Sequence, residues 1–120
     1  MRSLVLVAAA LLAGCTTVPD VIKTAPAGDV HVGEVRAEPA RFVGADVRWG
    51  GSVVSVRNER DATLIEIVAR RLDSAGQPRD EDLTEGRFLA KVAGFLDPAV
   101  YTKGREVTVR GRIEGVVEES

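Results

Sequence analysis

The fold class is decided by residues 47–58, with the sequence VRWGGSVVSVRN, in which apolar and polar residues alternate at the two-residue period of a β-strand. The apolar positions are odd before Gly50 and Gly51 and even after them. Because a shift of one residue turns every side chain to the opposite face, only an inserted bulge residue keeps both halves on one core. We therefore expect a bulge or bend at Gly50 and Gly51, with Trp49 and Val54 both facing inward.

Three further segments have the composition of β-strands. Residues 62–69 (ATLIEIVA) follow a polar turn and complete a hairpin with residues 47–58. Residues 86–92 (GRFLAKV) and 105–113 (REVTVRGRI) show the same β-branched, alternating character. Together the four segments predict a mainly β domain over residues 29–115, either a small antiparallel sheet or a partial OB-like Greek-key barrel.

One short helix is expected between the third and fourth of these strands. Asp97 followed by Pro98 resembles an N-cap with proline at the first helical position, and Gly104 closes the segment. We expect the two residues before the cap, Phe95 and Leu96, to lie in the core.

Length and charge exclude several classes of protein. The 120 residues are enough for one small domain, and 16 basic against 18 acidic residues leave a net charge of −2. A nucleic-acid surface needs a clear basic excess, so we predict no nucleic-acid partner. The chain has one Cys and one His, which rules out an internal disulfide and a zinc-type ligand set. No metal and no cofactor are predicted.

The N-terminus has the pattern of a targeting segment. Arg2 precedes ten apolar residues, 4–13 (LVLVAAALLA), and as a helix these would rise about 15 Å, half of the ~30 Å bilayer core. A positive charge, a short apolar run and then small residues are typical of a secretory signal peptide. We expect residues 1–14 to be such a signal peptide, in helical form, ahead of the β domain.

The residues that follow resemble the lipobox of bacterial lipoproteins, in the sequence Leu12-Ala13-Gly14-Cys15. This resemblance implies a diacylglycerol on the Cys15 thiol, cleavage between Gly14 and Cys15, and further acylation with palmitate-type chains. Thr16 stands where an Asp would signal retention in the inner membrane, which implies export to the outer membrane. We expect the domain to face the periplasm. The expected partners are the membrane, through the lipid anchor, and the lipoprotein maturation and export machinery.

The mature chain divides into three parts. Residues 15–28 contain Pro19 and Pro26 without periodicity, and they predict a lipidated tether. The β domain follows over residues 29–115, and the acidic residues 116–120 are expected to be frayed.

A set of short motifs runs in order from the lipobox to about Gly115. They are Cys15-Thr16-Thr17-Val18-Pro19-Asp20, Val43-Gly44, Val47-Arg48-Trp49-Gly50-Gly51, Leu64-Ile65-Glu66-Ile67, Leu72-Asp73-Ser74, Gly76 to Pro78 and Gly94-Phe95-Leu96-Asp97-Pro98. In this order they resemble the Slp (starvation lipoprotein) family of Gram-negative outer-membrane lipoproteins. The resemblance implies a link to starvation or stationary phase and no established catalytic activity. Members of this family usually continue with a further aromatic-containing strand, so this chain is either a short member or one whose C-terminus was lost, and the expected consequence is a sheet without a closing strand.

No residues show the spacing of a catalytic site, and we predict that the protein is not an enzyme. His31 has no nucleophile beside it, since Cys15 would be acylated, and the carboxylates Glu66 and Asp97 are scattered. Glu66 is expected to point outward from its strand. The leading hypothesis is a non-enzymatic envelope lipoprotein with a structural or binding role. The alternative is a module that binds an oligosaccharide or a protein partner on an OB-like barrel face.

Overall fold

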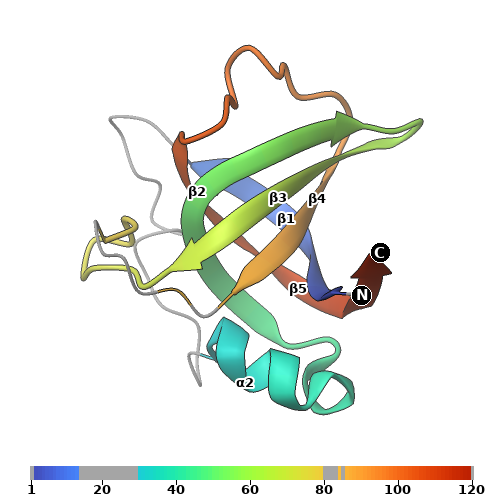
Figure 1. The fold of residues 1–120 in the computed structure, drawn as a ribbon, viewed down its shortest axis with the longest axis vertical. Coiled ribbons are helices and arrows are strands. Elements are labelled where there is room, and N and C mark those ends of the chain that lie inside the picture. The colour runs from blue at the N-terminus through green and yellow to red at the C-terminus, as the bar shows by residue number, and fades with distance from the viewer. Residues whose placement is uncertain (1, 14–29, 80–83, 85, 120) are drawn as a thin grey trace.

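A closed barrel of five strands forms the body of the protein (Figure 1). The computed structural model describes residues 2–13, 30–79, 84 and 86–119. Within them, the strands are β1 (Arg2–Ala13), β2 (Asp46–Asn58), β3 (Ala62–Arg70), β4 (Arg87–Ala93) and β5 (Glu106–Glu119), and they follow one another around the barrel as β1-β4-β3-β2-β5. The predicted mainly β fold is confirmed, and the described residues form a closed, OB-like barrel with one short α-helix, which lies at another place in the chain than predicted.

Strands β2, β3 and β4 form an antiparallel meander whose alternating residues fill the barrel. In β3, Ile65 and Ile67 are fully buried, whereas Glu66 between them points to the outer face, as predicted. Phe88 at the start of β4 is also fully buried, and its ring meets Trp49 edge-on with the centroids 5.2 Å apart. These β-branched and aromatic side chains suit a pleated surface that is buried on one side.

Strand β1 closes the barrel between β4 and β5. It runs parallel to β4 from Val5 to Ala9 and antiparallel to β5 along its whole length. Val5 and Val7 are fully buried in the interior. Two expectations are therefore wrong for this structure: residues 2–13 form a strand rather than a helix, and the barrel is closed rather than partial. The physical reason is that β4 and β5 offer two open hydrogen-bonding edges to an apolar segment.

The C-terminal segment belongs to the barrel as well. Strand β5 continues to Glu119, whereas residues 116–120 were expected to form a frayed end. Its end lies beside the start of β1, since Arg2 pairs with Glu119. Pairing with β1 gives the last residues of β5 backbone partners that their acidic composition does not reveal.

The bulge in β2 lies at Val54 and not at the glycine pair. The pairing of β2 with β3 is regular from Gly50 through Val53 and resumes at Ser55, so that one residue on β2 is extra. Strand β2 contains the inserted residue that the change of parity predicted, but the predicted place is wrong, because the inward series continues through the buried Val53. Trp49 faces inward as predicted, whereas Val54 is only half-buried.

Gly50 and Gly51 are needed for the close approach of neighbouring strands. Residues 50–52 pair with β3 on one side and with β5 on the other, where β2 curves from one to the other (Figure 1). A Cβ on Gly50 would lie 2.6 Å from the carbonyl oxygen of Val107, and one on Gly51 would overlap that of Val68. The backbone at both positions lacks a positive φ, so the requirement is space and not conformational freedom.

The short helix of the described residues precedes the meander. Helix α2 (Val32–Ala37) and the 3₁₀ turn η1 (Pro39–Phe42) lie across one end of the barrel (Figure 1). Val32 and Val35 of α2 are buried in the barrel core. This helix was not predicted, because two valines three residues apart on a six-residue segment are too weak a periodic signal.

The segment predicted as a helix, near Asp97, is a turn. The carboxylate of Asp97 accepts a hydrogen bond from the N–H of Ala99 at 2.8 Å, and its carbonyl accepts those of Val100 and Tyr101. Phe95 is 72% exposed and is not a core residue, whereas Leu96 is half-buried against the core. The Asp-Pro pair begins a turn here because Gly104 follows before a second helical turn can form.

None of the helices in the described part of the chain is long and apolar enough to cross a membrane.

Candidate functional site

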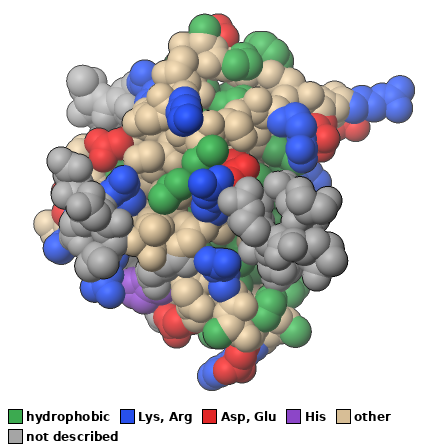
Figure 2. All heavy atoms as spheres, viewed as in Figure 1, with side chains coloured by type: hydrophobic (Ala, Val, Ile, Leu, Met, Phe, Trp, Pro, Cys, Tyr) green, Lys and Arg blue, Asp and Glu red, His purple; other side chains and the backbone are tan. Residues whose placement is uncertain are grey.

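A cavity of about 230 Å³ opens at the end of the barrel where α2 meets β2 and the end of β3. It is lined by His31, Val32, Arg48, Trp49, Gly50, Ala69, Arg70, Arg71, Leu72 and Arg79. Four of these residues are arginines, and no carboxylate is among the described residues that line the cavity. On the face that Figure 2 shows, Lys and Arg side chains are spread apart rather than gathered in one patch.

Trp49 gives the cavity a rigid wall. The indole is 4% exposed, and its Nε1–H donates a hydrogen bond to the carbonyl oxygen of Val30 at 2.8 Å. This bond ties the segment before α2 to β2, and the indole also makes an edge-on contact with the ring of Phe88. The burial of Trp49 indicates a structural role, and the exposed Phe95 does not line the cavity.

A tight loop after β3 carries two of the four arginines. Leu72 and Pro78 form an isolated β-bridge, and the N–H of Arg79 donates to the carbonyl of Arg71 at 2.8 Å. The loop is attached to the barrel by Thr108, whose buried hydroxyl donates to the carbonyl of Gly76 at 2.7 Å. Arg71 and Arg79 are thereby held at the cavity by backbone contacts.

Asp73 shapes the tip of this loop. Its carboxylate accepts hydrogen bonds from the N–H of Ala75 at 2.9 Å and of Gln77 at 3.0 Å. The hydrogen bond from Gln77 is the largest cause and lowers the pKa of Asp73. Desolvation, the second-largest cause, opposes it, and the bond from Ala75 and the charge of Arg79 lower the pKa further. The carboxylate is therefore charged at neutral pH, where it organises the loop.

The lining residues can recognise an anion but do not form a catalytic set. Arginine presents a planar group of N–H donors that matches phosphate and carboxylate oxygens. The side chain of Arg70 donates to Ser52 at 3.3 Å, which fixes its direction along β2. Within the described ranges, no three His, Cys, Asp or Glu side chains gather where a metal ion could bind.

The candidate residues from the sequence do not come together in this cavity. Gly14 and Cys15 lie outside the described residues. His31 lines the cavity and precedes α2, and its backbone N–H donates to the carboxylate of Glu34 at 3.1 Å. Glu66 and Asp97 are not among the lining residues.

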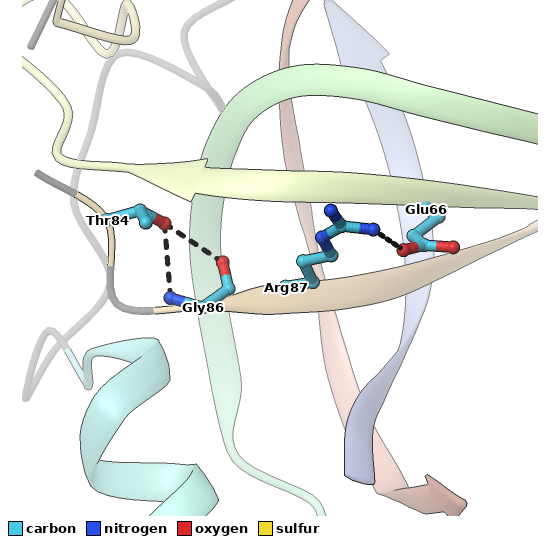
Figure 3. Close-up of polar contacts among 4 residues, drawn as sticks. All are labelled: Glu66, Thr84, Gly86 and Arg87. Atoms are coloured by element: carbon cyan, nitrogen blue, oxygen red, sulfur yellow. Dashed lines mark hydrogen bonds and ion pairs between the residues drawn. The ribbon is translucent and has the colours of Figure 1, made fainter. Parts of the chain in front are cut away.

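Glu66 has a structural partner on the outer face of the barrel (Figure 3). Its carboxylate accepts a hydrogen bond from the guanidinium of Arg87 on β4 at 2.7 Å, and its side chain is only 12% exposed. Close to this pair, the Thr84 hydroxyl lies 2.6 Å from the carbonyl of Ala69 and accepts the N–H of Gly86 at 3.1 Å. These contacts hold the segment that leads into β4 against β3. The ion pair with Arg87 gives Glu66 a structural role.

The arginine cluster itself has little signal in the sequence. Arg48 lies on β2, Arg70 ends β3, and Arg71 and Arg79 lie in the loop after it. Only the adjacent Arg70 and Arg71 are visible as a pair, and two charges are more often a solvated edge.

Comparison with known proteins defines the class to which this chain belongs. Residues 12–120 match the family described as "Outer membrane lipoprotein Slp family". The chain belongs to this family, as its motifs implied.

Two relatives from Escherichia coli (strain K12) show how much of the chain is shared. The chain is 41% identical over 111 residues to the "Uncharacterized lipoprotein YeaY", which covers 92% of this chain and 57% of that protein. It is 38% identical over 115 residues to the "Outer membrane protein Slp", which covers 94% of this chain and 61% of that protein. The chain thus spans about three fifths of the length of these curated relatives. No solved structure matches it significantly.

Proposed function

We propose that the mature protein is a lipid-anchored lipoprotein of the outer membrane, with its barrel domain in the periplasm and a non-enzymatic structural or binding role. The observation that carries this proposal is the lipobox-like segment at residues 12–15, directly after an apolar leader, in a chain of a lipoprotein family. Cleavage before Cys15 would remove residues 1–14 and leave residues 15–28 as the tether to the membrane.

The proposed anchor is sufficient for stable attachment. Each methylene group of an acyl chain buried in the bilayer contributes about 0.8 kcal/mol, and two lipid signals make membrane binding effectively permanent. Two or three acyl chains on Cys15 meet that requirement. Thr16 after the acylated Cys leaves export to the outer membrane as the expected route, and the lipoprotein maturation and export machinery are the partners that this route needs.

The first test is the Cys15→Ser variant. A hydroxyl is not alkylated by the maturation enzymes, so we expect loss of palmitate labelling and retention of the uncleaved leader. Wild-type protein is expected in the outer-membrane fraction with a mass that shows cleavage before Cys15 and added acyl chains. Thr17→Ser is the matched control, since it changes a neighbouring hydroxyl residue and leaves Cys15 in place. Palmitate labelling of the Cys15→Ser variant, or an unacylated mature wild-type protein, would contradict the proposal.

The alternative of a ligand-binding module is favoured by one observation, the arginine-lined cavity. Its four arginines favour an anionic group, a phosphate or a carboxylate, as the ligand. Trp49 lines the same cavity and is the one tryptophan of the chain, so its fluorescence reports on binding there.

The test of this alternative is a titration with pyrophosphate. We expect a saturable change in Trp49 emission, and a dissociation constant raised about tenfold in Arg71→Gln, the effect of losing one charge-assisted hydrogen bond. Arg57→Gln is the matched control, because Arg57 is an exposed arginine of β2 that does not line the cavity. Equal weakening in both variants would show general charge screening and would overturn the alternative.

A further inference from the structure

The arginine-lined cavity lies where the proposed tether joins the barrel. Val30 follows the tether closely, and its carbonyl oxygen accepts the hydrogen bond of the Trp49 indole at 2.8 Å. The next two residues, His31 and Val32, line the cavity themselves. The end of the tether that meets the domain is therefore fixed beside the cavity.

The cavity is formed without either end of the chain. Its described lining residues all lie between positions 31 and 79, so cleavage after residue 14 removes none of them. Figure 1 shows the end of β5 on the other side of the barrel from the loop that follows β3. The lining therefore does not depend on what precedes or follows the barrel domain.

Two of the arginines lie opposite each other at the exposed rim of the cavity. The N–H of Arg79 donates to the carbonyl of Arg71, and the adjacent residues Leu72 and Pro78 form a β-bridge. Both arginines are exposed. Like charges that lie directly opposite each other in paired segments repel. An anion that contacts both guanidinium groups removes this repulsion, so the pairing favours a negatively charged ligand.

The opposite end of β3 carries a balanced charge. The hairpin that joins β2 to β3 contains Arg57 and Arg60 together with Glu59 and Asp61. The Nε atom of Arg57 lies 3.5 Å from the carboxylate of Glu59. Since the described lining of the cavity contains no carboxylate, an anionic surface attracts the cavity end of the barrel more strongly than the hairpin.

We propose that the cavity binds the headgroup phosphate of an anionic glycerophospholipid in the membrane that holds the acyl chains of Cys15. The inference rests on the proposed function, because the lipid anchor brings the cavity to the bilayer. Arg71 and Arg79 present planar groups of N–H donors that match phosphate oxygens. At about 230 Å³ the cavity has room for several water molecules of about 30 Å³ each, and hence for one phosphate with its glycerol.

The anchor makes the bilayer the source of this phosphate. From Cys15 to Val30 the chain spans at most about 50 Å, even when it is fully extended. Headgroups around the anchor are confined within that reach, so their effective concentration at the cavity is at least about millimolar. A site with only weak affinity for free phosphate is filled under these conditions.

The charge of the lining also selects among headgroups. Phosphatidylcholine carries a quaternary ammonium group that balances its phosphate, whereas phosphatidylglycerol has a net negative charge. A basic residue near an anionic membrane surface strengthens binding about fivefold. The cavity therefore favours phosphatidylglycerol over phosphatidylcholine.

The experiment uses the lipoprotein purified from membranes and reconstituted in lipid nanodiscs. The discs contain phosphatidylcholine with an increasing share of phosphatidylglycerol, and a trace of lipid with a nitroxide on its headgroup. A nitroxide quenches tryptophan emission at close range, and Trp49 is the one tryptophan of the chain. We expect quenching of Trp49 that rises with phosphatidylglycerol and saturates, because the headgroup then occupies the cavity that Trp49 lines.

The double variant Arg71→Gln, Arg79→Gln tests the site. We expect the share of phosphatidylglycerol at half-maximal quenching to rise at least about tenfold, since two basic contacts are lost. The matched control is Arg57→Gln, Arg60→Gln, which removes the same charge from exposed positions at the other end of β3 and should leave the titration unchanged. Urea unfolding of both variants should give the wild-type midpoint, because all four side chains are exposed.

A titration with soluble glycerol phosphate in phosphatidylcholine discs separates a lipid headgroup from a free phosphate. If glycerol phosphate changes Trp49 emission while phosphatidylglycerol gives no quenching, the ligand is a soluble anion and the proposal is overturned. Equal losses in the two double variants would show general attraction to the membrane and would also overturn it. An absence of response to both ligands would mean that the cavity is closed or filled by another part of the protein, which overturns it as well.

Failure of the proposed function is visible in a separate measurement. The mass of the membrane-purified protein shows whether residues 1–14 are absent and Cys15 is acylated, whatever Trp49 reports. An unacylated protein would refute the anchor, whereas an acylated protein without quenching would refute only the headgroup site.

Discussion

Phe88→Ala is expected to lower the free energy of unfolding by about 3–5 kcal/mol, the range for removal of a large buried aromatic side chain. Phe88 is fully buried at the start of β4, and its ring is the edge-on partner of Trp49. The substitution leaves a cavity beside the indole and removes an aromatic pair from the centre of the barrel. Since a small domain is stable by only about 5–15 kcal/mol, this is a large part of the total.

Urea unfolding of the full chain, followed by circular dichroism and by Trp49 emission, measures this change. Phe95→Ala is the matched control, because Phe95 is 72% exposed and its removal should change stability by less than about 0.5 kcal/mol. The pair of variants also tests the corrected assignment of the core. Similar losses in both variants would contradict the burial of Phe88 and the exposure of Phe95.

Gly51→Val is expected to cost more than about 3 kcal/mol, at the upper end of what overpacking does in a close-packed interior. A Cβ at this position would overlap the carbonyl of Val68 on β3 and crowd the Cα of Ala69. Both are backbone atoms of the paired strand, so no side-chain rotation relieves the overlap. The variant has to separate β2 from β3 where β2 also pairs with β5.

Ser55→Val is the control for this substitution. It introduces the same side chain into the same strand at an exposed position, and we expect a change of less than about 0.5 kcal/mol. Amide hydrogen exchange should locate the damage, with faster exchange along the paired residues 50–53 of β2 in Gly51→Val. A folded Gly51→Val variant with wild-type stability would contradict the close approach of β2 and β3.

The central strands were predictable because their signal is local. Alternation in residues 47–58 and 62–69 predicted β2 and β3 to within one residue at each end. A two-residue period follows from the pleat of a single strand and needs no knowledge of its neighbours. The change of parity within residues 47–58 also predicted one bulge residue, but only the pairing with β3 assigned it to Val54.

Both helix predictions were wrong at places where tertiary packing, and not the local sequence, decides the structure. Asp97-Pro98 can begin either a helix or a turn. A turn forms here because Gly94 before it and Gly104 after it are both hydrogen-bonded to other parts of the barrel. Helix α2 has only Val32 and Val35 as its buried face, and its stability comes from covering one end of the barrel. Short helices depend mostly on such tertiary packing, since nucleation alone is unfavourable.

The arginine-lined cavity could not be predicted from the sequence, because separate elements of the fold form it. Its arginines come from β2, the end of β3 and the following loop, and they meet because β2 and β3 are paired and the loop is fastened by Thr108. The spacing of these arginines along the sequence therefore does not predict that they lie close together.

Residues 1–15 show most clearly the difference between what the sequence predicts and what the tertiary structure decides. The charge, the apolar run and the Cys15 motif are local features of the sequence, so the signal peptide and the lipidation site could be predicted from them without knowledge of the fold. That the same apolar run fits between β4 and β5 depends on two edges that the barrel creates far away in the sequence. Backbone hydrogen bonding is indifferent to sequence, so the composition of residues 2–13 predicted an apolar targeting segment, and only the tertiary structure placed these residues as a strand between β4 and β5.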